Sequence, residues 1–239
     1  ILEQEPTSPP ESFNLALPNS HCPQCGAAVK AWQNIPVLSY ILLRGRCASC
    51  QNKIGLRYPA VELATAALAV FTALQFGFTW QALAVILFSW LLMIMSVIDI
   101  DHQLLPDSLT LPLLWLGLAY NSLSDSVLLM DAVWGAIAGY LSLWSVYWLF
   151  KLITGKEGMG FGDFKLLAAL GAWLGWQMLP VIILLSSVVG AVLGITLLSL
   201  QGKGRNTSTP FGPYLAAAGW IAMFWGQDIL SAYMGFAGL

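Results

Sequence analysis

The sequence has very little charge. Only 9% of its 239 residues are Asp, Glu, Lys or Arg, whereas roughly 25% is usual in a soluble globular domain. Twelve acidic and ten basic side chains cannot cover the surface of a soluble protein of this length. The shortage of charge therefore excludes an ordinary cytosolic enzyme, a disordered protein and a basic nucleic-acid-binding protein.

Hydrophobic residues, which make up 58% of the chain, take the place of the missing charges. A helix of about 20 residues crosses the hydrocarbon core of a bilayer, which is about 30 Å thick. The composition predicts an all-α polytopic membrane protein in a lipid bilayer, with about seven membrane helices in this chain and no nucleic-acid partner. The apolar runs cover residues 60–78, 80–98, 108–121, 127–150, 164–176, 178–200 and 211–227.

Residues 1–57 differ from the rest of the chain. They hold five of the ten bases and all four cysteines, so we expect a small extramembrane module at 1–57 and a helical membrane domain at 58–239. The chain begins at Ile1, with neither an initiator methionine nor a signal peptide. We therefore expect a further segment before it.

The basic residues predict the orientation of the chain. When the seven runs are threaded alternately through a bilayer, all ten Lys and Arg residues fall on the side of the N-terminal module. Short cytoplasmic loops are enriched in Lys and Arg. The module is therefore expected to face the cytoplasm, and with it the connections at 99–107, 151–163 and 201–210.

The cysteines form two CxxC pairs, Cys22/Cys25 and Cys47/Cys50, separated by 21 residues. Two such pairs are typical of a tetrahedral structural Zn²⁺ site with four thiolate ligands. We expect a β-hairpin in the spacer. Two disulfides are the alternative, but a cytoplasmic module lies in a reducing compartment. With four cysteine ligands the metal has no open position, so it is expected to stabilise the fold rather than catalyse a reaction.

Two acidic motifs lie at the predicted cytoplasmic face: residues 99–107 (DIDHQLLPD) and residues 158–163 (GMGFGD). An acidic residue at the end of a membrane helix is costly unless it faces a polar cavity, and is functional by default. Two carboxyls brought together share a proton, so one can act as a general base towards water and the other as an acid towards a carbonyl. The glycines have two other interpretations, a dinucleotide loop or a plain flexible loop, but the first requires a βαβ unit.

Three acids compete to pair with Asp163. Asp99 directly follows the apolar run and lies deepest. At about 100° per residue, Asp101 points about 200° away from Asp99 if the helix continues. Asp107 follows a proline, and its position predicts an N-cap of the next helix. We therefore assign Asp99 and Asp163 to catalysis.

In this order and spacing, the motifs resemble those of the type IV prepilin peptidases, a family of GxGD-class intramembrane aspartic proteases. The matching segments are the two CxxC pairs, RYPAVE at 57–62, DIDHQLLPDSLTLP at 99–112 and GMGFGDFKL at 158–166. Family members begin with one further membrane helix, which brings the total to eight.

The resemblance implies a bifunctional enzyme of the bacterial inner membrane. It would cleave the basic leader of type IV prepilins and type II secretion pseudopilins after glycine. It would then N-methylate the new N-terminal residue, often phenylalanine, with S-adenosylmethionine. The catalytic pair carries over to Asp99 and Asp163, and the Zn²⁺ ligands to Cys22, Cys25, Cys47 and Cys50. The sequence does not place the S-adenosylmethionine site.

Two other classes of function remain as alternatives. A proton or cation transporter could use the membrane aspartates as a relay, although no ionisable residue continues the path to the opposite face. A zinc-bearing membrane scaffold without catalysis would leave both acidic motifs unexplained.

Overall fold

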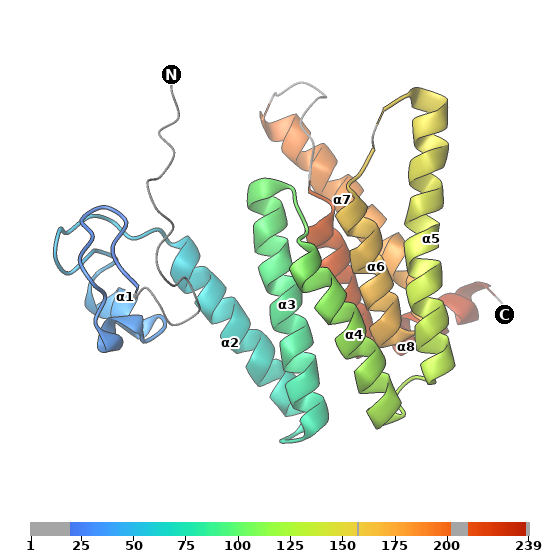
Figure 1. Ribbon diagram of the computed structural model, residues 1–239, viewed down its shortest axis with the longest axis horizontal. Coiled ribbons are helices and arrows are strands. Elements are labelled where there is room, and N and C mark those ends of the chain that lie inside the picture. Colours follow the sequence, from blue (N-terminus) through green and yellow to red (C-terminus); the bar gives the residue numbers. More distant parts are fainter. Residues whose placement is uncertain (1–19, 157, 202–209, 238–239) are drawn as a thin grey trace. The chain divides into compact units, whose positions relative to one another are not determined.

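The computed structural model describes residues 20–156, 158–201 and 210–237, and within these ranges the chain forms helices and no β-strand (Figure 1). This agrees with the predicted all-α class. The chain divides into two compact units between Ala67 and Leu68, a point that lies within helix α2 (Arg57–Phe76). The domain boundary at residue 57 remains a proposal from the sequence.

The N-terminal unit contains two short helices, η1 (Ala31–Asn34) and α1 (Leu38–Leu42), between the cysteine pairs. The expected β-hairpin in this spacer was therefore wrong. Pro36 has no N–H to contribute to a strand ladder. In addition, the Glu62 carboxylate accepts a hydrogen bond of 2.8 Å from the N–H of Val37, at the start of α1. Glu62 thus ties the spacer to the first turns of α2.

The C-terminal unit contains the rest of α2 and six longer helices. Their bounds follow the predicted apolar runs closely, and most extend a few residues beyond them. A short 3₁₀ helix, η2 (Trp176–Met178), links two of the six. The longer helices are α3 (Trp80–His102), α4 (Asp107–Ser124), α5 (Leu129–Thr154), α6 (Phe161–Leu174), α7 (Leu179–Gln201) and α8 (Gly212–Ala237).

Helix α6 is the centre of this unit. Eleven of its 14 residues are buried, and it packs against α4, α5, α7 and α8. A helix that is hydrophobic on all sides is buried on all sides. This explains why α6 can be shorter than a bilayer is thick: protein surrounds it, as short helices at membrane depth require.

Helices α5 and α6 approach each other at glycines. A Cβ atom at Gly135 would collide with the carbonyl oxygen of Gly171, and one at Gly139 would lie 2.6 Å from the carbonyl oxygen of Leu167. Small residues of this kind let membrane helices pack with their backbones close together. The contact therefore fixes the lateral position of α6.

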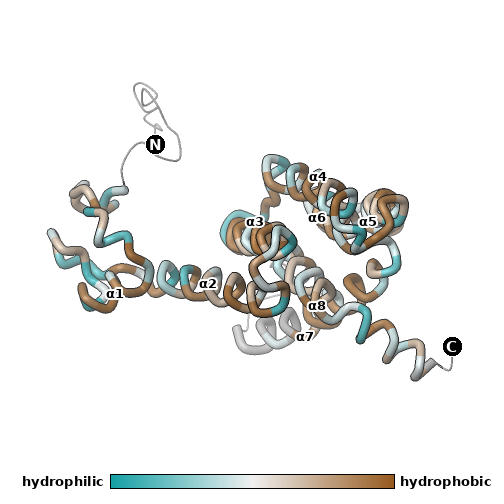
Figure 2. Tube along the Cα trace, turned by 90° about the horizontal axis from the view of Figure 1, so that it is seen from below, coloured by the Kyte–Doolittle hydropathy of each residue, from teal (hydrophilic) through white to brown (hydrophobic). Residues whose placement is uncertain are grey.

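In the described part of the chain, three helices, α2, α3 and α5, are long and apolar enough to cross a membrane. In Figure 2, which views α3 and α5 nearly end-on, both helices contain hydrophobic segments, drawn in brown. Large apolar side chains also lie exposed on the outer faces of the helices, among them Leu74, Leu123 and Leu152. Such a surface suits lipid rather than water.

Candidate active site and metal centre

Asp99 and Asp163 are both buried, although each is ionisable. Their exposed fractions are 5% and 7%, and they are the only acidic or basic side chains buried in the described part of the chain. Each lies at the end of a helix: Asp99 in the last turn of α3 and Asp163 in the first turn of α6. Buried carboxyls are rare and usually functional in a membrane protein.

The start of α8 holds Asp99 in place. The backbone N–H of Gly212, the first residue of α8, donates a hydrogen bond of 2.9 Å to Oδ2 of Asp99. The first N–H groups of a helix have no partner within the helix, and the helix dipole favours a negative charge there. A Cβ atom at position 212 would lie 2.6 Å from the same oxygen. Only glycine leaves room for this contact.

Asp163 lies beside Gly160, the N-cap residue at the start of α6. The N–H of Asp163 donates a hydrogen bond of 3.3 Å to the carbonyl of Gly160, and a Cβ at Gly160 would lie 3.9 Å from Oδ2 of Asp163. Leu105 packs against both Gly162 and Gly212. A Cβ added at Gly162 would lie 2.6 Å from Cβ of Leu105, and a Cβ added at Gly212 would lie 3.2 Å from Cδ1 of Leu105.

The two carboxyls lie within range of each other's charge. Figure 1 shows α3 ending at the face of the C-terminal unit where α4, α6 and α8 begin. The site is therefore assembled from helix ends that are far apart in the sequence.

The other two acids of the loop lie outside this pair. Helix α3 continues to His102, so Asp101 is helical and exposed, on a different side from Asp99, as the periodicity predicted. The N-cap assignment of Asp107 was wrong by one residue. Pro106 is the N-cap, and Asp107 is the first helical residue. Its two oxygens lie 2.6 and 2.7 Å from Nζ of Lys165, so it joins the starts of α4 and α6.

Gly212 and Leu105 were not predicted from the sequence. The available signal for Gly212 was Pro-Phe-Gly-Pro at 210–213, at the start of the last apolar run, because proline is common in the first positions of a helix. Leu105 had no signal, because one leucine in a hydrophobic chain does not stand out.

In the N-terminal unit, the four cysteines converge. Their sulfur atoms all lie within 4.8 Å of one another, and Sγ of Cys22 is 3.9 Å from Sγ of Cys50. All four are free thiols. A tetrahedral Zn²⁺ with bonds of about 2.3 Å separates its sulfurs by about 3.8 Å. The cluster therefore has the donor set and the approximate size of a zinc site.

The two cysteine pairs lie on two turns of the same local structure. The N–H of Gly26 bonds to the carbonyl of Cys22 at 2.9 Å, and the N–H of Gln51 bonds to the carbonyl of Cys47 at 3.0 Å. Gly26 and Gln51 both have positive φ, at 68° and 58°. Single β-bridges, His21 with Ala28 and Arg46 with Lys53, close the two turns.

The thiols ionise unequally. Backbone N–H groups of Cys50 and Ser49 lower the pKa of Cys47 to about 6, which favours the thiolate that binds metals. At Cys25 the N–H of Ala27, which lowers the pKa, is outweighed by desolvation and by the other three thiols, and the pKa rises to about 11. The four sulfurs together offer the donor set for one cation.

Comparison with known proteins assigns both parts of the chain. Residues 86–195, which include both aspartates, match the model of the type IV leader peptidase family, and residues 6–76, which include the four cysteines, match the bacterial peptidase A24 N-terminal domain. Among its relatives, the chain is 60% identical to a protein of Pseudomonas aeruginosa over 237 residues, covering 99% of this chain and 81% of that protein. The chain belongs to the type IV leader peptidase family.

Other relatives support the same assignment. A protein of Stutzerimonas stutzeri is 60% identical over 228 residues, which cover 95% of this chain and 79% of that protein. A protein of Xanthomonas campestris is 50% identical over 239 residues, which cover 100% of this chain and 83% of that protein. All three relatives carry the name prepilin leader peptidase/N-methyltransferase, and no solved structure matches the chain. The family resemblance predicted from the motifs is confirmed.

Proposed function

We propose that this chain cleaves the basic leader peptide from type IV prepilins and type II secretion pseudopilins after glycine, and then N-methylates the new N-terminus. Membership of the family supports both activities. The observation that carries the first is the burial of Asp99 and Asp163 at adjoining helix ends, within range of each other's charge.

In this mechanism the two carboxyls share one proton. The ionised carboxyl removes a proton from a water molecule as the water attacks the carbonyl carbon of the glycine. The protonated carboxyl gives its proton to the carbonyl oxygen. When the C–N bond breaks, the carboxyl that took the water's proton gives it to the leaving amine, and the hydroxyl formed from the carbonyl oxygen returns its proton to the other carboxyl, so the pair regains its starting state. The backbone N–H of Gly212 holds the Asp99 carboxyl in position throughout, and the carbonyl of Gly160 holds the backbone of Asp163.

The four cysteines would hold one structural Zn²⁺. The close approach of four free thiols supports this assignment. With no open position the ion supplies folding free energy rather than chemistry. A module of this size has only a small hydrophobic core, so metal binding would supply much of the free energy that orders the two cysteine turns.

S-adenosylmethionine would be the methyl donor, since an N-methyltransferase requires one. For its site we propose a cavity of about 520 Å³ in the N-terminal unit, a size that suits a small-molecule ligand. Its lining includes both cysteine turns, the ring of Tyr58 and the carboxylate of Glu62. A carboxylate and an aromatic face both suit a donor that carries a positive charge on sulfur. Glu62→Gln should weaken binding of S-adenosylmethionine, measured by calorimetry, and leave leader cleavage intact.

We further propose that the chain spans the bacterial inner membrane with seven helices and a cytoplasmic active site. The clustering of Lys151, Lys156 and Lys165 near the ends of α5 and α6 at the aspartate face supports this orientation. In intact cells, a membrane-impermeant thiol reagent should label Ser124→Cys from outside and Lys156→Cys only after permeabilisation. The reverse pattern would show the opposite orientation.

The decisive experiment is incubation of the purified chain with a prepilin and S-adenosylmethionine. Mass spectrometry should show loss of the leader and then addition of one methyl group. A transporter or an inert scaffold produces neither change. The Asp163→Asn variant should still methylate a substrate supplied already cleaved. If this variant is folded but inactive in both assays, the two activities share one site and the proposal of separate sites fails.

A further inference from the structure

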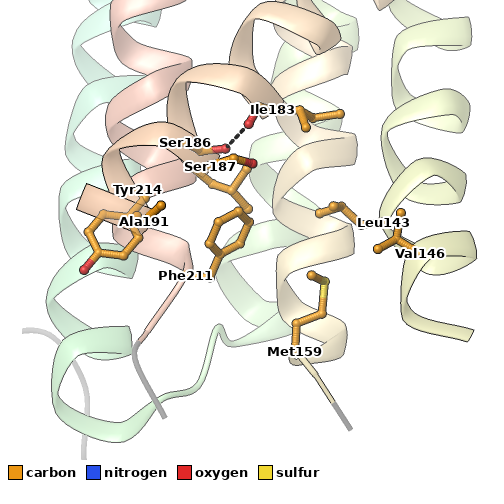
Figure 3. A pocket seen from close by; sticks show the side chains of 11 residues that line it. Leu143, Val146, Met159, Ile183, Ser186, Ser187, Ala191, Phe211 and Tyr214 are labelled. Carbon is orange, nitrogen blue, oxygen red and sulfur yellow. Dashed lines mark hydrogen bonds between the residues drawn. The ribbon is translucent and has the colours of Figure 1, made fainter. Parts of the chain in front are cut away.

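A second cavity, of about 420 Å³, lies within the C-terminal unit beside the aspartate site. It is bounded by α5, by the segment before α6, by α7 and by the start of α8 (Figure 3). Met159 and Phe211 form two of its walls. Met159 directly precedes Gly160, which bonds to Asp163, and Phe211 directly precedes Gly212, which bonds to Asp99. We refer to this space as the apolar cavity.

None of the described residues that line the apolar cavity carries a charged side chain. Hydrocarbon and aromatic groups dominate it, among them Leu143, Val146 and Phe211. The hydroxyl of Ser186 is already used, because it donates a hydrogen bond of 3.1 Å to the carbonyl of Ile183 (Figure 3). A pocket of this volume and chemistry binds an apolar group rather than a charged one.

We propose that the apolar cavity binds an apolar side chain of the prepilin segment that follows the cleaved bond. This inference rests on the proposed peptidase function and identifies which part of the substrate the cavity receives. The resemblance implies a basic leader, and the described lining of the cavity offers it no acidic partner. It also implies that the segment after the cleaved bond often begins with phenylalanine, an apolar residue.

The position of the cavity supports the same occupant. The cleaved carbonyl must lie at the two aspartates. Met159 and Phe211, which form two walls of the cavity, directly precede Gly160 and Gly212, the glycines that contact those aspartates. An extended substrate advances about 3.3–3.6 Å per residue. The first few residues after the bond can therefore reach the cavity while the carbonyl stays at the site.

A matched pair of substitutions on α7 tests the proposal. Ser187 lines the cavity, whereas the next residue, Val188, is 59% exposed and does not line it. Ser187→Trp should raise KM for a full-length prepilin at least about tenfold, which is the usual effect of a misfit in an apolar pocket. Val188→Trp should stay within about twofold of the unmodified chain. A normal KM for a folded Ser187→Trp variant would overturn the proposal.

A second measurement does not depend on turnover. The Asp163→Asn variant, which is expected to bind but not cleave, is mixed with prepilins carrying a photoreactive phenylalanine at successive positions around the glycine. Positions after the bond should crosslink to Met159, Ser187 or Phe211, and leader positions should not. Crosslinking from the leader alone would overturn the proposal.

A lipid tail is the competing occupant. If a photoreactive acyl chain labels the cavity and an excess of prepilin does not displace it, the cavity is a lipid site and the proposal is wrong. Displacement of the acyl chain by prepilin supports the proposal. If the unmodified chain cleaves no prepilin, the proposed function itself is wrong. This outcome can be told apart from failure of the cavity proposal, because the crosslinks are measured without turnover.

Discussion

The cysteine cluster and the aspartate pair are both convergent sites, but they are built in opposite ways. The cluster joins two copies of one local turn, and its Cys22–Cys50 contact spans 28 residues. In the aspartate site, the contact between Asp99 and Gly212 spans 113 residues and depends on the packing of buried helices. The proposed Zn²⁺ would hold the turns of the first site together, whereas the second site depends on the helical core. A mutation that disrupts one site should therefore leave the other site folded.

The largest effect should come from the aspartates. Asp99→Asn or Asp163→Asn should lower the rate of leader cleavage by about a thousandfold or more, since each change removes one partner of an acid–base pair. Far-UV circular dichroism should show the helices intact, because Asn has almost the same shape. Cleavage is measured by the size shift of a prepilin.

Asp101→Asn is the matched control, because Asp101 lies two residues from Asp99 on the same helix but is exposed. It should retain most of the activity. If Asp101→Asn abolishes cleavage and Asp99→Asn does not, the assignment of the pair is wrong.

The next largest effect should be confined to the N-terminal unit. Cys22→Ser should reduce bound zinc from about one ion per chain to none, and zinc binding contributes on the order of 10 kcal/mol to a small metal-dependent fold. Limited proteolysis should then cut within residues 20–56, while the helices of the C-terminal unit stay protected. Elemental analysis gives the metal content.

Two results would contradict the zinc prediction. The unmodified chain could contain no zinc, or Cys22 and Cys25 could be joined in a disulfide in the native protein. Collapse of both units after Cys22→Ser would instead show that the two sites depend on each other.

A smaller effect is expected at the start of α8. Gly212→Ala places a methyl group 2.6 Å from Oδ2 of Asp99, and overpacking of this kind costs about 1–3 kcal/mol. The cleavage rate should fall because the carboxyl is displaced, with little change in the melting of the N-terminal unit. Gly235→Ala, in the same helix, is the control because a Cβ there meets nothing within 4 Å. Equal effects of the two changes would show that Gly212 acts only through helix stability.

The same contrast explains how much the sequence could predict. The cysteine pairs, the helices and the two catalytic candidates follow from local features: a CxxC spacing, a long apolar run, an acid at the end of that run. The burial of Asp99 and the exposure of Asp101 also followed, because helical periodicity alone separates them.

What the sequence could not predict depends on helices meeting in space. Gly212 matters only because α8 begins where α3 ends. No local sequence pattern predicts that these two helix ends lie side by side. The helical spacer between the cysteine pairs was missed because its shape depends on Glu62, 25 residues away from Val37. The contact of Asp107 with Lys165 was missed because Lys165 lies 58 residues along the chain.

The smallest effect should come from that last contact. Asp107 and Lys165 form an ion pair, but their side chains are 57% and 29% exposed, and exposed pairs contribute about 0–1 kcal/mol. Asp107→Asn should therefore change cleavage and unfolding only slightly, although Asp107 lies in the same loop region as Asp99. In a double-mutant cycle with Lys165→Gln, the coupling energy should stay below about 1 kcal/mol and shrink as salt is added. A loss of cleavage as large as that of Asp99→Asn, with the chain still folded, would mean that Asp107 takes part in the reaction and that the active site extends beyond the buried pair.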